Sequence, residues 1–251
     1  MLTWITAFLD TTPAHWEVAH TFWTAVTGYG LSPFRGPDRE LVTLVPPAGD
    51  GYLRMQRLGS GPARVHLDLH VADRRAAAEA AVALGARELA DRGHVVMASP
   101  GGLPFCFVAP DGSVRPPAAR WLMDGAAGGS VAGAGATHAS LVDQVALDIP
   151  AEHWESETRF WSALTGWVAP PSTDEFAPLD RPAGQPLRLL PHRLGEPMGA
   201  VRAHLDLATS DRVAETVRHV ALGAEVERAT DQWTVLRAPD GRLYCLTDRR
   251  P

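Results

Sequence analysis

Two copies of the sequence His-Leu-Asp-Leu place an imidazole and a carboxylate two residues apart, at His66 and Asp68 and again at His204 and Asp206. In an extended strand, residues two apart point to the same side. Apolar residues alternate with them, so each polar pair faces away from the apolar core. An imidazole beside a carboxylate can move protons, bind a metal ion or hold a polar ligand. The two segments are therefore the candidate chemical centres of the chain.

Each pair belongs to the same succession of local structure signals. The first lies on an alternating stretch that begins at Arg64; Asp73 then suits a helix N-cap, and Gly85 suits the left-handed residue that ends a helix. The stretch from Arg202 to Glu225 repeats this pattern. We therefore expect both pairs to lie on a strand that is followed by a helix.

The repeat extends over most of the chain. His66 recurs as His204, 138 residues later, and the same shift relates the Phe-Trp pair at 22–23 to the pair at 160–161. A repeat of this length indicates two tandem domains rather than a solenoid, whose repeats are about 20–50 residues long. The order of strand and helix signals in each half predicts two βαβββ units per domain.

The predicted domain boundaries follow from composition. The segment DGAAGGSVAGAGAT is rich in glycine and alanine and nearly uncharged, which is typical of a flexible linker. We predict a first domain at 1–120, a linker at 121–137 and a second domain at 138–251.

Charge and composition exclude several protein classes. The net charge is −6, with 23 basic and 29 acidic residues and no basic run, which argues against a nucleic-acid surface. No apolar run approaches the roughly 20 residues of a membrane helix, and the first residues do not resemble a signal peptide. The two cysteines form no CxxC pair, so we expect reduced thiols and a cytoplasmic protein with no nucleic-acid or membrane partner.

The alternation also predicts which side chains face the hollow side of each sheet. Apolar residues point to the covering helices, and the polar residues between them point the other way. Such an arrangement is costly unless the polar groups pair or face a wet cavity. The candidate ligand-binding residues are Thr6, Arg54, Gln56, His66, Asp68 and Cys106 in the first half, and Gln144, Asp148, Arg188, His204, Asp206, Trp233 and Cys245 in the second.

Several motifs occur twice in a fixed order: FWTAVTGY and FWSALTGW, VHLDL and AHLDL, then ASPGGLPFCF and RAPDGRLYCL. With these motifs the chain resembles the glyoxalase/bleomycin-resistance/extradiol-dioxygenase superfamily, also called vicinal oxygen chelate, and in particular its tandem glyoxalase-like proteins. The resemblance implies an α+β fold. In that fold, paired βαβββ units form a curled mixed sheet around a pocket.

The resemblance also implies where a divalent metal would be held. Enzymes of the superfamily use four strand positions, usually occupied by two His or Gln and two Glu. Both glutamates are absent here, so we expect no metal; if one is bound, Gln144, His204 and Cys245 are the candidate ligands, completed by Asp206 or Asp148. The four positions carry over to Thr6, Gln56, His66 and Cys106 in the first half and to Gln144, Leu190, His204 and Cys245 in the second.

Two classes of function remain open at this point. The first is a binding protein that sequesters an antibiotic or another organic metabolite. The second is a metal-dependent lyase, isomerase or dioxygenase acting on vicinal oxygens, with a metal-free acid–base enzyme as a variant. The pairs Arg54–Asp68 and Arg188–Asp206 are expected to form salt bridges, or else to leave the arginine free for an anion.

The number of working sites and of subunits is open as well. The halves differ at Thr6/Gln144 and Gln56/Leu190, so the two pockets are not expected to share a ligand. One half could serve only as a scaffold. The protein could be a monomer, whose halves mimic a family dimer, or a homodimer.

Overall fold

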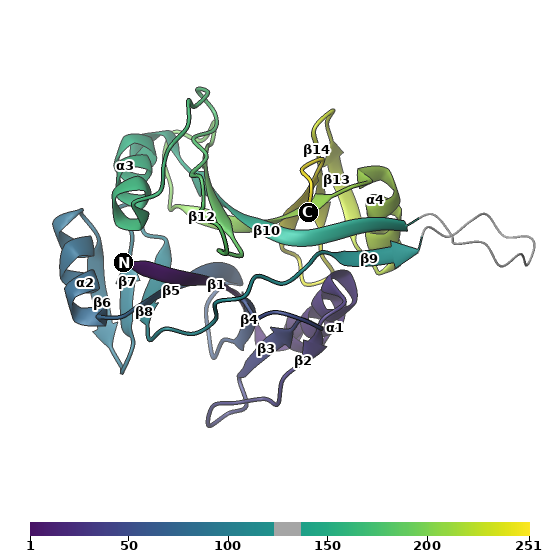
Figure 1. The fold of residues 1–251 in the computed structure, drawn as a ribbon, viewed down its shortest axis with the longest axis horizontal. Coiled ribbons are helices and arrows are strands. Elements are labelled where there is room, and N and C mark those ends of the chain that lie inside the picture. The colour runs from purple at the N-terminus through teal and green to yellow at the C-terminus, as the bar shows by residue number, and fades with distance from the viewer. Residues whose placement is uncertain (123–136) are drawn as a thin grey trace, which may run out of the picture.

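The computed structural model describes residues 1–122 and 137–251. Within these residues the strands form two curled mixed sheets, one from each half of the chain (Figure 1). This confirms the predicted α+β fold of two glyoxalase-like halves. The predicted linker lies mostly outside the described residues, and no described helix is long and apolar enough to span a bilayer.

The first sheet has the strand order β2-β3-β4-β1-β5-β8-β7-β6, so the first strands of its two units, β1 and β5, lie together at the centre. β1 pairs parallel with β4 and antiparallel with β5. The elements are β1 (Leu2–Thr11), α1 (Trp16–Thr27), β2 (Gly30–Leu31), β3 (Leu41–Val45), β4 (Leu53–Arg57), β5 (Arg64–Val71), α2 (Arg74–Ala83), β6 (Arg87–Asp91), β7 (Val95–Ala98) and β8 (Pro104–Val108).

The second sheet repeats this plan with the order β11-β10-β12-β15-β14-β13, and β9 pairs with β10. Its elements are β9 (Ala119–Leu122), β10 (Thr137–Ile149), α3 (Trp154–Thr165), β11 (Arg188–Arg193), β12 (Arg202–Thr209), α4 (Arg212–Ala221), β13 (Glu225–Ala229), β14 (Trp233–Arg237) and β15 (Leu243–Thr247).

The third βαβββ unit departs from the prediction. Between α3 and β11, where two strands were expected, the chain forms only isolated bridges such as Val168–Asp180 and Phe176–His192. Proline lacks the backbone N–H that a strand ladder requires. This segment holds five prolines: Pro170, Pro171, Pro178, Pro182 and Pro186.

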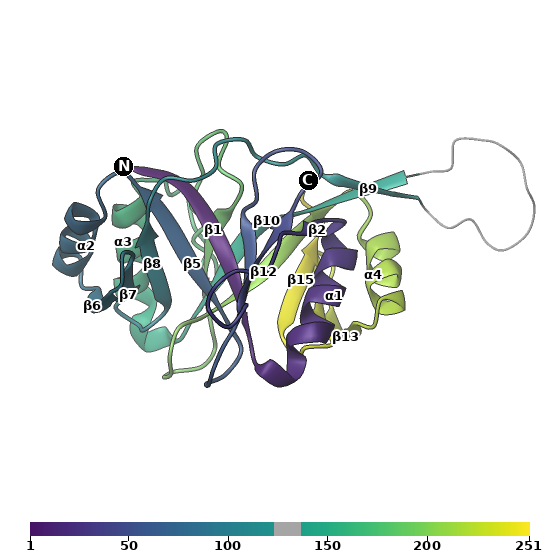
Figure 2. The same ribbon diagram turned by 90° about the horizontal axis from the view of Figure 1, so that it is seen from below.

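The main apolar core lies between the two sheets. Trp23 of α1 packs on Tyr244 of β15, with ring centroids 5.3 Å apart, and Trp161 of α3 packs on Phe105 of β8 at 5.5 Å. Each half therefore inserts a helix against the sheet of the other half. Figure 2 shows the result, with α1 beside α4 and α2 beside α3. The polar sides of both sheets face away from this core, as the alternation predicts.

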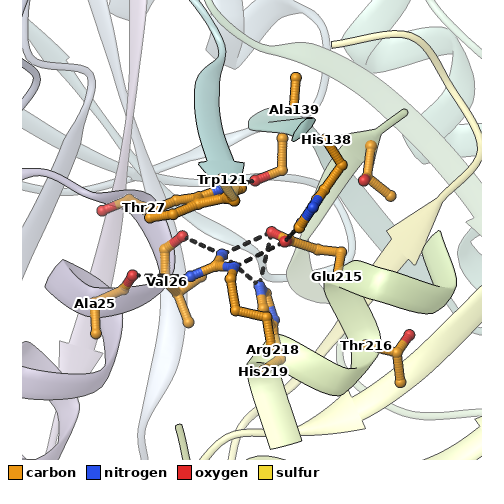
Figure 3. Close-up of polar contacts among 12 residues, drawn as sticks. Ala25, Val26, Thr27, Trp121, His138, Ala139, Glu215, Thr216, Arg218 and His219 are labelled. Carbon is orange, nitrogen blue, oxygen red and sulfur yellow. Dashed lines mark hydrogen bonds and ion pairs between the residues drawn. The ribbon is translucent and has the colours of Figure 1, made fainter. Parts of the chain in front are cut away.

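A buried ionic cluster crosses the same interface (Figure 3). Arg218 of α4 donates to the carbonyl oxygens of Ala25 and Val26, at the end of α1 in the first half. Its guanidinium is paired with Glu215, whose carboxylate is fully buried and also accepts from Nε2 of His138 at 2.6 Å. Charge-assisted hydrogen bonds in a low-dielectric interior are strong, so this cluster ties the halves together.

Trp121 completes the cluster. It lies in β9, which adds to the second sheet. Its indole nitrogen donates to Ser140 at 2.8 Å, and the guanidinium of Arg218 lies 3.7 Å from the centre of its ring. A cation over an indole face is attracted by the ring quadrupole.

Candidate functional site

A cavity of about 990 Å³ opens on the hollow side of the second sheet. Its floor is formed by β10, β12, β14 and β15, and segments 62–65 and 102–104 of the first half contribute to its wall. Phe176 and Trp233, whose rings meet edge to face at 6.0 Å, form an aromatic side of the cavity. The volume and the mixture of apolar walls with a few polar groups are typical of small-molecule sites.

The strand register arranges the hollow-side residues in three rows across the sheet. Neighbours in a row come from adjacent strands and therefore lie close together. The first row is Arg188, Gln144, Asp206 and Cys245; the second is Leu190, Ala146 and His204; the third is His192, Asp148 and Arg202.

The polar floor is centred on Asp148. Its carboxylate accepts from Nδ1 of His192 at 2.9 Å and from Nδ1 of His204 at 2.7 Å. The other nitrogen of His204, Nε2, lies 3.3 Å from Oδ1 of Asp206 and 3.5 Å from Sγ of Cys245. Nε2 is thus the imidazole atom directed at the group formed by Asp206 and Cys245.

This arrangement makes an ion pair of Asp148 and His204. Burial works against both charges, but the mutual attraction and hydrogen bonds of the two groups outweigh it. The pKa of His204 is therefore held well above its ordinary value, and the pKa of Asp148 is lowered. The arrangement therefore favours the imidazolium form of His204, which donates hydrogen bonds and does not act as a base.

The raised pKa of His204 predicts a pH dependence of stability. The folded state binds this proton more tightly than the unfolded state, so the stabilisation is complete below about pH 6.5 and declines as the pH rises toward the folded pKa. We expect the free energy of unfolding, measured in urea between pH 6 and 9, to fall more steeply for the native protein than for His204→Gln. Parallel curves for the two proteins would contradict the ion pair.

The first half has the same rows, but its histidine, His66, is buried under a neighbouring side chain. Phe8 occupies the position of Ala146, and its ring stacks on His66 with centroids 4.5 Å apart and planes 13° apart. The guanidinium of Arg54 lies 5.9 Å from the centre of the same ring and is paired with Asp111. The space above His66 is therefore filled by side chains.

Several polar groups of the first half are paired with one another. Nδ1 of His66 lies 2.9 Å from Oδ1 of Asp10, and Arg64 donates to Oδ2 of the same carboxylate. Thr6 is hydrogen-bonded to His70, which is buried. Asp68 and Cys106 lie beside each other on adjacent strands, and burial raises the pKa of both.

Both expected salt bridges are wrong. Arg54 pairs with Asp111 instead of Asp68. Arg188 and Asp206 lie on strands that flank β10, with Gln144 between them, and Gln144 donates to Asp206 through Nε2. No ion pair joins Arg188 and Asp206 among the described residues, whereas Arg249 lies 4.0 Å from Oδ2 of that carboxylate.

The strand register also changes which residues of the two halves are equivalent to each other. Phe8 lies beside Arg54 and Ala146 beside Leu190, so Arg54 corresponds to Leu190, and Gln56 corresponds to His192. The sequence comparison, which matched Arg54 with Arg188 and Gln56 with Leu190, was two residues out of register. It missed His192 for that reason. The segments before β4 and β11 differ in conformation, so no single shift carries across them.

The remaining predicted residues fall into two groups. Gln144, Asp148, His204, Asp206, Trp233 and Cys245 line the cavity, whereas Arg188 is not among the lining residues and lies next to Gln144 on the neighbouring strand. Arg249 was not predicted and also lines the cavity. It comes from the last residues of the chain, after the final strand, where no periodic pattern indicates a direction.

Comparison with known proteins agrees with the fold. The family model for a glyoxalase-like domain matches residues 6–108 and 144–247. No curated protein matches the chain in sequence.

Solved structures share the fold at low sequence identity. The Mn(II)-bound glyoxalase from Novosphingobium aromaticivorans is 17% identical, with a TM-score of 0.62 over 98% of this chain and 82% of its own. A variant of 4-hydroxymandelate synthase from Streptomyces coelicolor is 15% identical, with a TM-score of 0.64 over 100% of this chain and 94% of its own. The 2,2',3-trihydroxybiphenyl 1,2-dioxygenase from Sphingomonas wittichii is 14% identical, with a TM-score of 0.60 over 98% and 90%. The two matched segments and the paired curled sheets lead to one conclusion: the chain is a member of the glyoxalase-like domain family, within the vicinal oxygen chelate superfamily.

Proposed function

We propose that this protein binds a small organic molecule, such as an antibiotic or another metabolite, in the cavity of its second half. The cavity offers aromatic and aliphatic walls for the body of the molecule. Its floor offers the polar group formed by His204, Asp206 and Cys245, in which Nε2 of His204 lies 3.3 Å from Oδ1 of Asp206. A few polar groups among apolar walls fix the orientation of a bound small molecule.

The observation that carries this proposal is the contrast between matched positions. Phe8 and Arg54 fill the first half, whereas Ala146 and Leu190 leave the second half open over the same Asp–His pair. In this proposal the first half serves as a structural scaffold and the second half binds the ligand.

An uncharged fluorescent probe tests the proposal. N-phenyl-1-naphthylamine brightens in apolar surroundings and matches the aromatic walls. We expect a saturable rise in its emission on titration with the protein, and energy transfer from tryptophan because Trp233 lines the cavity. A linear, unsaturable response equal to that of urea-unfolded protein would refute the proposal.

A metal-dependent enzyme is the second candidate, and one observation favours it. His204, Asp206 and Cys245 can bring three donor atoms within 4.8 Å of one another. Asp148 holds the far nitrogen of the histidine, as carboxylates do behind zinc-bound imidazoles. A set of one imidazole, one carboxylate and one thiolate fits Zn²⁺, whereas Mn²⁺ prefers oxygen donors.

Bound at these three residues, zinc would polarise a carbonyl group or a water molecule. His204 and Cys245 would release protons on binding it, as His and Cys ligands generally do. Asp148 would keep the imidazole oriented, and Trp233 and Phe176 would shield the site from water.

Metal analysis of untagged protein separates the two candidates. For the binding protein we expect far less than one zinc per chain, and no rise in melting temperature when zinc is added. One zinc per chain that is lost in His204→Ala but retained in His66→Ala would establish the metal-dependent alternative instead.

A further inference from the structure

One arginine next to a cavity-lining residue has no polar partner among the described residues. Arg188 lies in the first row, next to Gln144, on the hollow side of the edge strand β11. It is half-buried, yet its guanidinium makes no side-chain hydrogen bond or ion pair with the residues that the structure describes. A guanidinium has five N–H donors, and a partly buried one is normally paired.

Two neighbouring arginines, unlike Arg188, already have polar partners. Arg181 donates to the backbone carbonyls of Asp143 and Pro186. Arg249, which lines the cavity, is paired with the Asp143 carboxylate and lies 4.0 Å from Oδ2 of Asp206.

Positive charge is in excess at this end of the cavity. Four arginines influence one another there, since Arg115 of the first half acts on Arg181, and Arg249 acts on Arg188. Burial is the main cause that lowers the pKa of Arg188, and the charge of Arg249 adds to it. The nearby carboxylates are Asp143, which Arg249 already occupies, Asp206, which Gln144 occupies, and the exposed Asp180.

We propose that Arg188, together with Arg249, holds the anionic group of the ligand, so that the cavity takes an amphiphilic organic anion. The anion, a carboxylate, sulfonate or phosphate, lies beside Gln144, and the apolar body extends along Leu190 toward Trp233. Guanidinium groups bind such anions through paired N–H donors. This inference rests on the proposed binding function and specifies the class of molecule that is bound.

Two probes with the same aromatic frame test the inference. 1-Anilinonaphthalene-8-sulfonate carries a sulfonate, and N-phenyl-1-naphthylamine is its uncharged counterpart. In Arg188→Gln we expect the affinity for the sulfonate probe to fall about tenfold or more. The affinity for the uncharged probe should stay within about twofold, because no partner of Arg188 is disturbed. Arg188→Lys should retain part of the sulfonate affinity.

Arg237→Gln is the matched control. Arg237 lies on β14 of the same sheet, is paired with Glu227 and is not among the described residues that line the cavity. Its loss should leave the affinity for the sulfonate probe within about twofold of the native value. Equal loss in both variants, or no loss in Arg188→Gln while both probes still saturate, overturns the anion site and leaves the binding function intact. Failure of both probes to saturate overturns the binding function itself.

Discussion

Replacing Ala146 with phenylalanine is expected to lower the affinity of the second-half cavity for N-phenyl-1-naphthylamine by about 100-fold or more. The new ring would stack on His204, as the ring of Phe8 stacks on His66 at the equivalent position. Since the cavity has about 990 Å³ of open space, the ring fits without the strain of an overpacked core. Fluorescence titration measures the affinity, and urea unfolding verifies that the variant is folded.

The control substitution is Ala229→Phe. Ala229 is exposed on the edge strand β13 and does not line the cavity, so the same change of side chain should leave probe binding unaltered. Native affinity in Ala146→Phe would mean that the probe binds elsewhere and that the cavity is not the binding site.

Removing the carboxylate of Glu215 is expected to have the largest effect on stability. Glu215→Ala should lower the free energy of unfolding by about 3–5 kcal/mol, the usual cost of leaving a buried charge unpaired. Burial opposes the charge of this group, but hydrogen bonds from Arg218 and His219 lower its pKa. Without the carboxylate, the guanidinium of Arg218 is left between the halves with no counter-charge, and His138 loses its hydrogen-bond acceptor. Urea unfolding followed by tryptophan fluorescence measures the change.

The matched control is the exposed pair of the equivalent helix in the first half. Glu88 is paired with Arg75 of α2 at 2.9 Å, with both side chains at least one-third exposed. Glu88→Ala should cost less than about 1 kcal/mol, because solvent screens such pairs. A cost of Glu215→Ala no larger than that of Glu88→Ala would contradict the role of the cluster at the interface.

Much of this fold could be predicted from the sequence because its signals are local and repeated. The alternation around His66 and His204 indicates which way each imidazole points, and the shift of 138 residues identifies two copies of one domain. The same reasoning correctly directs Asp148 and Asp206 to the hollow side, where both line the cavity.

The parts that could not be predicted depend on pairing between strands. Alternation gives the face of a strand but not its register, so His192 was overlooked as a partner of Asp148. Phe8 covers His66 in the first half, whereas Ala146 leaves His204 uncovered in the second. This difference is apparent only when strand pairing places each residue opposite its histidine. Trp121 lies just before the segment rich in glycine and alanine, and its partners Ser140 and Arg218 could not be predicted because they are distant in sequence.

The number of probe molecules bound per chain tests the central claim, which is one open site and one closed site in a duplicated fold. It is measured by titrating N-phenyl-1-naphthylamine at a protein concentration far above the dissociation constant, so that the break point gives the stoichiometry. We predict one molecule per chain, and none in Ala146→Phe. Two equivalent molecules per chain, one of them remaining in Ala146→Phe, would show that the first half is open as well and would contradict the account.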